Sequence, residues 1–323
     1  MRHSFQTAAA LLAALLVAAC SPHEFPESGS GYPERDFSLK ITFEDDLPDY
    51  RHLRPATKAG DVARLRYTVL FWRYLSENAF GLDPDYSFSF ERSSIAELDT
   101  VIYLPIDPAK YRVAGWVDWV GGDAGVGYDV SNPEQIRLPA SYDAGEHARD
   151  AFTVVTDFNV DGFRRAGMTY EKTVVLKRPV AQLRIVSPEA LTFIAQTGLD
   201  PSQMRATLRY ASPIPDGYNI LLGTTLGARK DVTLTGTPRY DSSGELVFLS
   251  DFIFLMDDAT VSVEFTLTDL SGKEIIVWSG ELPLRNSHAT TLSFDMPYGG
   301  DDKPGGIGIS PGFDEEIEVP INN

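Results

Sequence analysis

Regular alternation of apolar and polar residues is the feature that most limits how this chain can fold. Phe37, Leu39, Ile41 and Phe43 alternate with polar residues without an exception. The same period of two recurs at 65–71, 260–268, 292–296 and 317–321. Successive side chains of a strand point to opposite faces, so such segments place one face on a core and the other in water. The chain is therefore predicted to be mostly β, in antiparallel sheets packed as sandwiches.

Turn signals and helix signals complete this pattern. The predicted turns are Asp216-Gly217, Ser243-Gly244, Ser271-Gly272 and Gly121-Gly122. One or two short helices are expected, the first from Ser187, which can cap it, to Gly198, which can end it. The side chains expected to face the core from this helix are Leu191, Ile194 and Ala195. A second short helix is expected near 93–98.

Chain length and a proline indicate two domains. A chain of 323 residues is long enough for two hydrophobic cores of ordinary size. Apolar runs at 173–176 and 180–186 flank Arg178-Pro179. Proline cannot donate a hydrogen bond to a sheet, so a strand interrupted there is a natural crossing point between sheets. We expect an N-terminal domain at 36–178 and a C-terminal domain at 179–323.

The N-terminus carries an export signal. Met1-Arg2-His3 is basic, and residues 8–19 are almost all apolar, far short of the roughly 20 residues that a membrane-spanning helix needs. The run ends at Cys20 and resembles the lipobox of bacterial lipoproteins. That resemblance implies that residues 1–19 are a signal peptide and that Cys20 carries a diacylglycerol and a fatty acid such as palmitate. The alternative is a signal peptide that contains a cysteine by chance.

The segment after Cys20 is expected to be a tether. Residues 20–35 are rich in Pro, Gly and Ser, a composition typical of flexible linkers. Cys20 is the only cysteine, so no disulfide stabilises the chain. The lipid is then the sole expected membrane anchor, at the cell surface and outer membrane. In such bacteria, acidic residues near the cysteine direct lipoproteins outward, and Glu24 and Glu27 match that weakly.

Charge and motifs exclude several function classes. A net charge of −18 argues against nucleic acid and anionic lipid as partners. There is no Gly-x-Ser-x-Gly motif, and the five histidines have no metal-ligand spacing. The glycine cluster at 121–127 opens no helix and is interpreted as a hairpin loop. Acidic pairs at 257–258, 301–302 and 315–316 are interpreted as solvated turn charges, although calcium is the alternative. We expect no enzyme, metal or cofactor.

Two tryptophans are candidates for glycan contact. Sugar-binding modules stack planar aromatic rings on pyranose faces, and Trp116 and Trp119 lie among glycines. The alternative is that both pack in a core or at its rim. Trp72 and Trp278 lie beside alternating core positions and are expected to be structural.

The first alternating strand is followed by a basic segment. Residues 45–60 are polar and contain Arg51, Arg54 and Lys58, and a second strand follows at 61–72. A basic, exposed linker between two strands is a good target for a trypsin-like protease. We therefore consider these three residues as protease processing sites.

This order of parts resembles the fimbrillins, the subunits of protease-assembled (type V) pili, and related fimbrillin-like lipoproteins. The matching parts are Cys20, the short tether, the strand at 37–44, the Arg-bearing linker and the strand that begins at 62–65. The junction at 175–184 and the tail at 307–321 also look like those of the group. The resemblance implies two tandem transthyretin-like or immunoglobulin-like β-sandwich domains.

The resemblance also implies a mechanism. In that family a protease cuts after an arginine in the linker, the first strand is lost, and the open groove accepts a strand from the next subunit. Arg51 is the best-placed site here, because Pro55 follows Arg54 and proline blocks most trypsin-like cleavage. The exchangeable strand would then contain Phe37, Leu39, Ile41 and Phe43. The alternative is an ordinary first strand that never leaves.

Two functions follow as hypotheses. The first is a lipid-anchored structural protein, a fimbrillin-like pilus subunit or an accessory or anchor component, whose partners are other pilus subunits. The second is a glycan-binding surface lipoprotein that works with polysaccharide uptake.

The tail at 313–321 is expected to supply a final strand, with a frayed acidic tail as the alternative.

Overall fold

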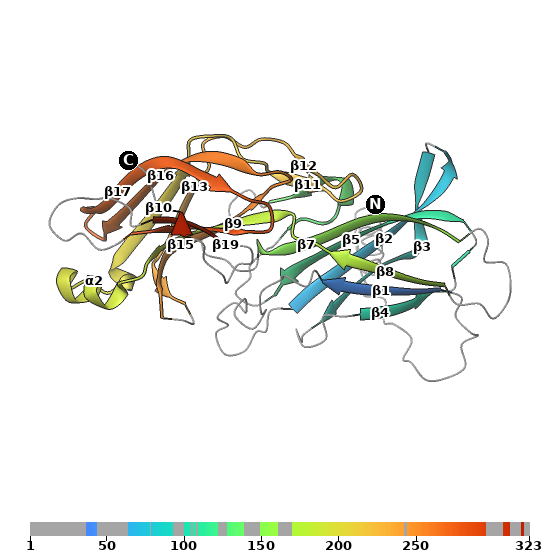
Figure 1. The fold of residues 1–323 in the computed structure, drawn as a ribbon, viewed down its shortest axis with the longest axis horizontal. Coiled ribbons are helices and arrows are strands. Elements are labelled where there is room, and N and C mark those ends of the chain that lie inside the picture. Colours follow the sequence, from blue (N-terminus) through green and yellow to red (C-terminus); the bar gives the residue numbers. More distant parts are fainter. Residues whose placement is uncertain are drawn as a thin grey trace, which may run out of the picture.

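The described part of the protein is built mostly from β-strands. The computed structural model describes residues 37–43, 64–77, 79–92, 100–104, 106–107, 109–121, 128–138, 149–160, 170–241, 244–294, 306–310 and 318–319. Their strands form sheets in two units that lie end to end along the longest axis of the molecule (Figure 1). The prediction of a mostly β fold with sandwich domains is confirmed.

The N-terminal half contains two sheets. Its strands are β1 (Phe37–Phe43), β2 (Arg64–Ser76), β3 (Ala79–Arg92), β4 (Thr100–Leu104), β5 (Lys110–Val120), β6 (Ile136–Arg137), β7 (Ala151–Asn159) and β8 (Tyr170–Leu176), with the 3₁₀ turn η5 (Pro133–Gln135) before β6. One sheet has the order β4-β1-β8, and the other has the order β3-β2-β5-β7. Apolar side chains alternate along these strands, and the inward ones fill the space between the two sheets.

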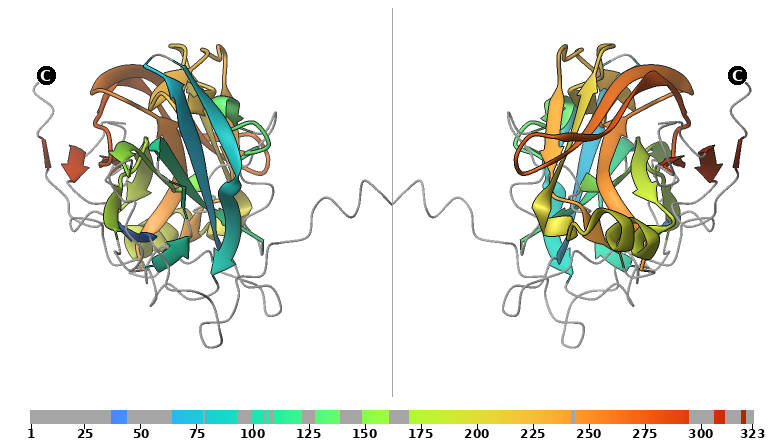
Figure 2. Two further views of the ribbon diagram at one scale, coloured as in Figure 1. Left: turned by 90° about the vertical axis from the view of Figure 1, so that its right-hand side faces the viewer. Right: turned by 90° about the vertical axis from the view of Figure 1, so that its left-hand side faces the viewer.

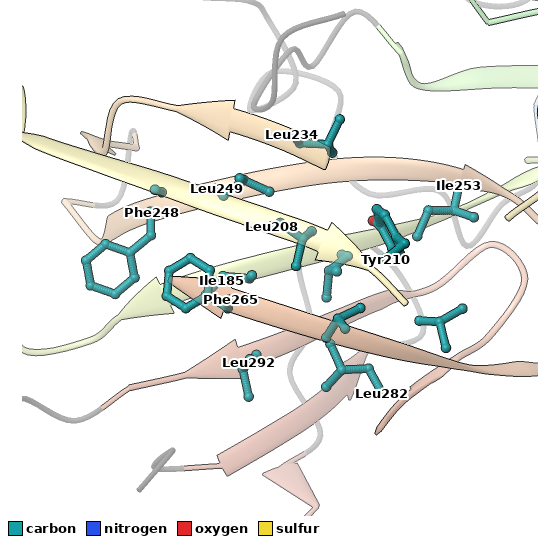
Figure 3. Close-up of a cluster of buried hydrophobic side chains, with 14 of the residues drawn as sticks. Ile185, Leu208, Tyr210, Leu234, Phe248, Leu249, Ile253, Phe265, Leu282 and Leu292 are labelled. Atoms are coloured by element: carbon teal, nitrogen blue, oxygen red, sulfur yellow. The ribbon is translucent and has the colours of Figure 1, made fainter. Parts of the chain in front are cut away.

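The C-terminal half also contains two sheets. Its strands are β9 (Val180–Ser187), β10 (Met204–Tyr210), β11 (Gly217–Asn219), β12 (Thr224–Leu226), β13 (Thr233–Gly236), β14 (Arg239–Tyr240), β15 (Leu246–Phe254), β16 (Ala259–Asp269), β17 (Glu274–Leu284), β18 (Ala289–Ser293), β19 (Gly306–Ser310) and β20 (Glu318–Val319), with the helix α2 (Ala190–Thr197) and the 3₁₀ turn η7 (Pro201–Gln203). The sheets have the orders β14-β15-β9-β18-β19-β20 and β13-β10-β16-β17. Their inward side chains, among them Leu208, Phe265 and Leu282, form one core (Figure 3).

The two halves repeat one topology. In each half the first strand is central in its sheet, with an antiparallel neighbour on one edge and a later strand, parallel to it, on the other. β1 lies between β4 and β8, and β9 lies between β15 and β18. The second sheets match as well, because β3-β2-β5-β7 and β13-β10-β16-β17 are both wholly antiparallel. β9 is therefore the structural counterpart of β1.

The change of sheets occurs at the predicted crossing point. β8 ends at Leu176 and β9 begins at Val180, so Arg178-Pro179 lies between two sandwiches. One small sheet departs from this division, because β6 of the first half pairs with β11 of the second. The limits 36–178 and 179–323 stay a prediction.

The two sandwiches share a third apolar core. Trp72, Ala114 and Trp116 from the outer face of the β2-β5 sheet belong to one buried cluster with Tyr218 and Phe254 of the second half. The Trp116 ring lies 5.9 Å from the Tyr218 ring and 6.3 Å from the Phe254 ring. Burial raises the pKa of Tyr218 to about 12. Since this contact is apolar and well buried, it holds the two sandwiches together as one body.

Gly217 allows the sheet that joins the halves. A Cβ atom at this position would lie 2.6 Å from the carbonyl oxygen of Ile136, closer than any side chain can approach. Asp216-Gly217 was predicted as a turn, and that prediction is wrong, because Gly217 begins β11 and pairs with Arg137. A glycine in a strand often marks such a close backbone approach.

Two buried ion pairs also lie at the junction. Arg178 donates to both carboxylate oxygens of Asp150, at 2.9 Å from Nε to Oδ1 and 2.9 Å from Nη2 to Oδ2, and both side chains are buried. Arg149 pairs with Asp251 across the halves, and the hydroxyl of Tyr210 donates to Asp251 at 2.8 Å. Burial raises the pKa of the Asp150 carboxyl, and Arg178 opposes this shift.

The helix prediction is correct in part. α2 ends at Gly198, whose amide donates to the carbonyl of Ile194, as expected. Ser187 does not cap the helix, because it is the last residue of β9 and is paired with Leu246. Leu191 is 82% exposed instead of facing the core. The second helix, expected at 93–98, lies outside the described residues. No helix in the described ranges is long and apolar enough to cross a membrane.

The predicted turn at Ser271-Gly272 is present, and of the predicted turn at Ser243-Gly244 the structure describes Gly244. Gly244 follows β14, Gly272 follows β16, and both have a φ of 88°, a conformation that favours glycine. The turn at Gly121 begins where β5 ends. Of the predicted strands, 37–44 and 260–268 correspond to β1 and β16, and β20 accounts for 318–319 of the tail.

Asp150→Ala is expected to destabilise the protein by about 3–5 kcal/mol, because it leaves the buried Arg178 guanidinium without its partner. The free energy of unfolding in urea checks this. Glu91→Ala is the matched control, since it breaks the exposed Arg64–Glu91 pair and is expected to have a much smaller effect. Equal losses for the two variants would contradict the structural role of the buried pair.

Candidate strand-exchange groove

β1 is hydrogen-bonded along both of its edges. On one edge it runs antiparallel to β4, where Leu39 is paired with Ile102. On the other edge it runs parallel to β8, from Phe37 opposite Tyr170 to Phe43 opposite Leu176. Figure 1 shows β1 between these two strands. A strand in this position completes its sheet, since neither neighbour reaches the other without it.

The inward side chains of β1 are part of the core. Leu39 is 0% exposed and Ile41 is 2% exposed. They pack against the facing sheet, in one buried cluster with Tyr67, Val69 and Val113. The alternation in the sequence predicts this inward face correctly. For Phe37 and Phe43 the structure describes the backbone only, so their predicted place in the core stays a prediction.

The outward side of β1 is held by polar contacts. The hydroxyl of Thr42 donates to the carbonyl of Val174 on β8 at 3.3 Å. Ser38 is buried, and Lys40 is half-buried. The outward face of β1 thus contributes a hydroxyl contact to β8. The apolar contacts of β1 come from its inward face.

β1 fills a gap between two strands, unlike a strand at the edge of a sheet. Without β1, the backbone groups of β4 and β8 that face it would have no partners, and the core would be open where Leu39 and Ile41 lie. Burying two such side chains stabilises the fold by roughly 1.5–3 kcal/mol each. An extended segment from another chain can supply both the backbone hydrogen bonds and the apolar contacts, as in strand addition to an open sheet.

The connections of β1 differ from those of its counterpart. β9 follows β8 after residues 177–179 and is followed by α2, which begins at Ala190. β1 is joined to β2 by residues 44–63. β9 therefore has short connections to both neighbouring elements, whereas 20 residues separate β1 from β2.

Several predicted site residues lie outside the described residues. These are the lipidation site Cys20 and the processing candidates Arg51, Arg54 and Lys58. They stay predictions. Within the described part of the chain, no group of His, Cys, Asp and Glu is arranged to hold a metal ion.

The proposed glycan contacts are wrong for Trp116 and Trp119. Trp116 is 0% exposed, because it fills the core between the two sandwiches, where its ring meets Tyr128 edge-on at 5.2 Å. Trp119 is 2% exposed and belongs to the core of the N-terminal sandwich. A ring with no exposed face cannot stack on a sugar. The alternative interpretation, core packing, holds for both.

A family assignment agrees with the two-sandwich fold. The model of the family of unknown function DUF6562 matches residues 34–322. The chain belongs to this family. No curated protein matches the sequence.

Solved structures share the fold of this DUF6562 protein. A Bacteroides thetaiotaomicron protein, whose name proposes polysaccharide binding and which belongs to DUF1812, matches with a TM-score of 0.50 and 14% identity, over 89% of this chain and 99% of that chain. At this identity the likeness establishes a shared fold and no shared ligand.

Fimbrial proteins are also among the structural neighbours. The fimbrial anchor protein Mfa2 from Porphyromonas gingivalis matches with a TM-score of 0.41 and 15% identity, over 87% of this chain and 99% of that chain. The tip fimbrial protein Mfa3 from the same organism has a TM-score of 0.44 and 11% identity, over 85% of this chain and 98% of that chain.

Leu39→Ala in this DUF6562 protein is expected to cost about 2–5 kcal/mol, because the side chain is wholly buried beneath the sheet. Chemical unfolding followed by tryptophan fluorescence measures the change. Lys40→Ala, on the half-buried outward face of the same strand, is the control and is expected to change stability far less. If Leu39→Ala were as mild as the control, β1 would not contribute to the core.

Proposed function

We propose that this protein is a lipid-anchored structural protein of the bacterial surface, a fimbrillin-like pilus subunit or an accessory or anchor component. It assembles by strand exchange: β1 leaves the N-terminal sandwich and an extended segment of another subunit takes its place. Its partners are other pilus subunits, and its role is adhesive and structural instead of catalytic. The membrane is reached through the lipid on Cys20 alone.

One observation carries this proposal. β1 is paired on both edges, with β4 and with β8, yet its connection to β2 runs through residues 44–63. A central strand is the hardest kind to lose unless its place is refilled, because two neighbours keep unpaired backbone groups. A strand that is necessary for the fold and also attached by a long segment with three Lys or Arg residues suits an assembly device.

The position of the basic residues supports the order of events. Arg51, Arg54 and Lys58 all lie between β1 and β2 in the sequence. Cleavage after Arg51 would separate β1 and the lipidated N-terminus from the rest of the chain. The remaining chain would then keep β2 to β20 and the buried junction between the two sandwiches.

The alternative, a glycan-binding surface lipoprotein, loses its residue basis. It was drawn from Trp116 and Trp119, which are buried. The protein from Bacteroides thetaiotaomicron carries a name that proposes polysaccharide binding, but 14% identity transfers only the fold.

The intact mass of the protein recovered from the surface of its host tests the proposal. We expect a lipidated species that starts at Cys20 when the host's surface proteases are absent. With the proteases present, we expect a lipid-free species that starts after Arg51. Arg51→Ala is expected to block this shift or move it to Lys58.

Arg92→Ala is the matched control, because Arg92 is an exposed basic residue at the end of β3. This variant is expected to be processed like the unchanged protein. A lipidated, monomeric species that starts at Cys20 in every sample would overturn the proposal of strand removal.

A further inference from the structure

One inward position beneath β1 has no side chain. The residues of β5 that face the groove are Tyr111, Val113, Gly115, Val117 and Trp119, and all but Gly115 are apolar and buried. Gly115 is paired with Val69 on β2 and with Val154 on β7. The glycine therefore lies in the middle of the sheet that β1 covers.

A cavity lies at this position. It has a volume of about 10 Å³ and is lined by apolar groups, which include Leu39 and Ile41 of β1 and Val174 and Leu176 of β8. The opposite wall contains Gly115 with its neighbours Val69 and Val154. A space of this size is about that of one water molecule, and an apolar space stays dry. The inward side chains of β1 therefore cover a void.

Gly115 is not required for a close backbone approach. A Cβ atom built there would have two neighbours within 4 Å, the Val154 Cγ1 at 3.1 Å and the Leu176 Cδ2 at 3.7 Å, and both belong to side chains. This is unlike Gly217, where a Cβ atom would meet a carbonyl oxygen. A methyl group at position 115 needs only a small movement of Val154. The usual reason for a glycine inside a strand is absent here.

The second sandwich has no such gap in the corresponding strand. β16 is the counterpart of β5, since each lies next to the second strand of its sandwich. Its inward residues are Val261, Val263, Phe265 and Leu267, and all four are buried. The C-terminal sandwich, whose first strand β9 has short connections, therefore has an apolar side chain at each of these inward positions of β16. The N-terminal sandwich, whose first strand β1 is attached by residues 44–63, has Gly115 in β5.

We propose that Gly115 makes this groove specific for a strand of another subunit that carries a larger apolar side chain over the cavity than the Leu39 and Ile41 of β1. β1 then binds in this groove more weakly than the donated strand does. This inference rests on the proposed function, because it names the kind of partner strand that the exchange site takes.

The same geometry gives no preference to the β1 of a second copy. A second copy of this chain that donated its own β1 would bring the same two side chains and leave the same cavity. The favoured occupant is therefore an extended segment with alternating apolar residues and a phenylalanine or a side chain of similar size over Gly115. Such a segment can form the same backbone hydrogen bonds as β1. Its larger side chain fills the cavity and adds van der Waals contacts that β1 lacks.

The stability of the uncut full-length chain tests the cavity first. Leu39→Phe and Ile41→Phe are each made alone and together with Gly115→Ala. Enlarging a core side chain normally destabilises a protein. We expect at least one of the two phenylalanine variants to have an unfolding midpoint equal to or above that of the unchanged protein. When the same substitution is combined with Gly115→Ala, we expect the midpoint to fall below that of the unchanged protein.

Gly81→Ala is the matched control for Gly115→Ala. Gly81 lies in β3, and a Cβ atom there would make an ordinary contact with Leu75 Cδ1 at 3.6 Å. It shares the gain in strand propensity but does not face the cavity. If both phenylalanine variants lowered the midpoint equally with and without Gly115→Ala, the inference would be wrong.

Peptide exchange tests specificity. The folded full-length chain is cut within residues 44–63 by a trypsin-like protease and is then offered peptides of residues 37–43, either unchanged or with Leu39→Phe or Ile41→Phe. We expect the better phenylalanine peptide to bind about fivefold more tightly than the unchanged peptide. Gly115→Ala is expected to abolish this preference, and Gly81→Ala to keep it.

The outcomes separate the two proposals. Exchange of all peptides with no preference for phenylalanine overturns the specificity of Gly115 and leaves strand exchange standing. No exchange of any peptide contradicts the proposed function, and the stability series then decides alone whether the cavity under β1 accepts a larger side chain.

Discussion

The pairing of β1 with both β4 and β8 is the interaction on which the rest of the N-terminal sandwich depends. Buried backbone N–H and C=O groups need partners, and β1 supplies them to two strands at once. It also covers the core through Leu39 and Ile41. The strand is thus necessary to its sheet, and in the proposed function it is also the strand that leaves. An element that combines these two properties gives a fold that is complete only when some strand occupies the groove.

The repeated topology gives an internal comparison. β9 holds the same central place as β1, but short connections fix it, and the strand beneath it is filled by residues such as Phe265. The two sandwiches are joined by the core around Trp116 and by the buried pairs of Arg149 with Asp251 and Arg178 with Asp150. In the proposed exchange at β1, the second half and the junction would therefore stay intact.

Much of the fold could be predicted from the sequence, because period-two alternation reports burial directly. The alternation predicted β1, with Leu39 on its inward face, and it predicted β16. It could not show that β6 pairs with β11, because pairs between the two halves leave no local pattern. The sequence left both core packing and glycan contact open for Trp116 for the same reason: the partners that bury it, Tyr218 and Phe254, are distant in sequence. Neither Gly115 nor the buried ion pairs had a sequence signal, since their meaning depends on what lies opposite.

Amide hydrogen exchange of the full-length chain, before and after a cut within residues 44–63 and addition of a competing strand peptide, tests the central claim most directly. The account predicts that β4 and β8 lose protection when β1 leaves and regain it when a peptide occupies the groove, while β9 and β15 stay protected throughout. Unchanged protection of β4 and β8 after β1 has been removed would contradict it, because the two strands would then not depend on β1 for their hydrogen bonds.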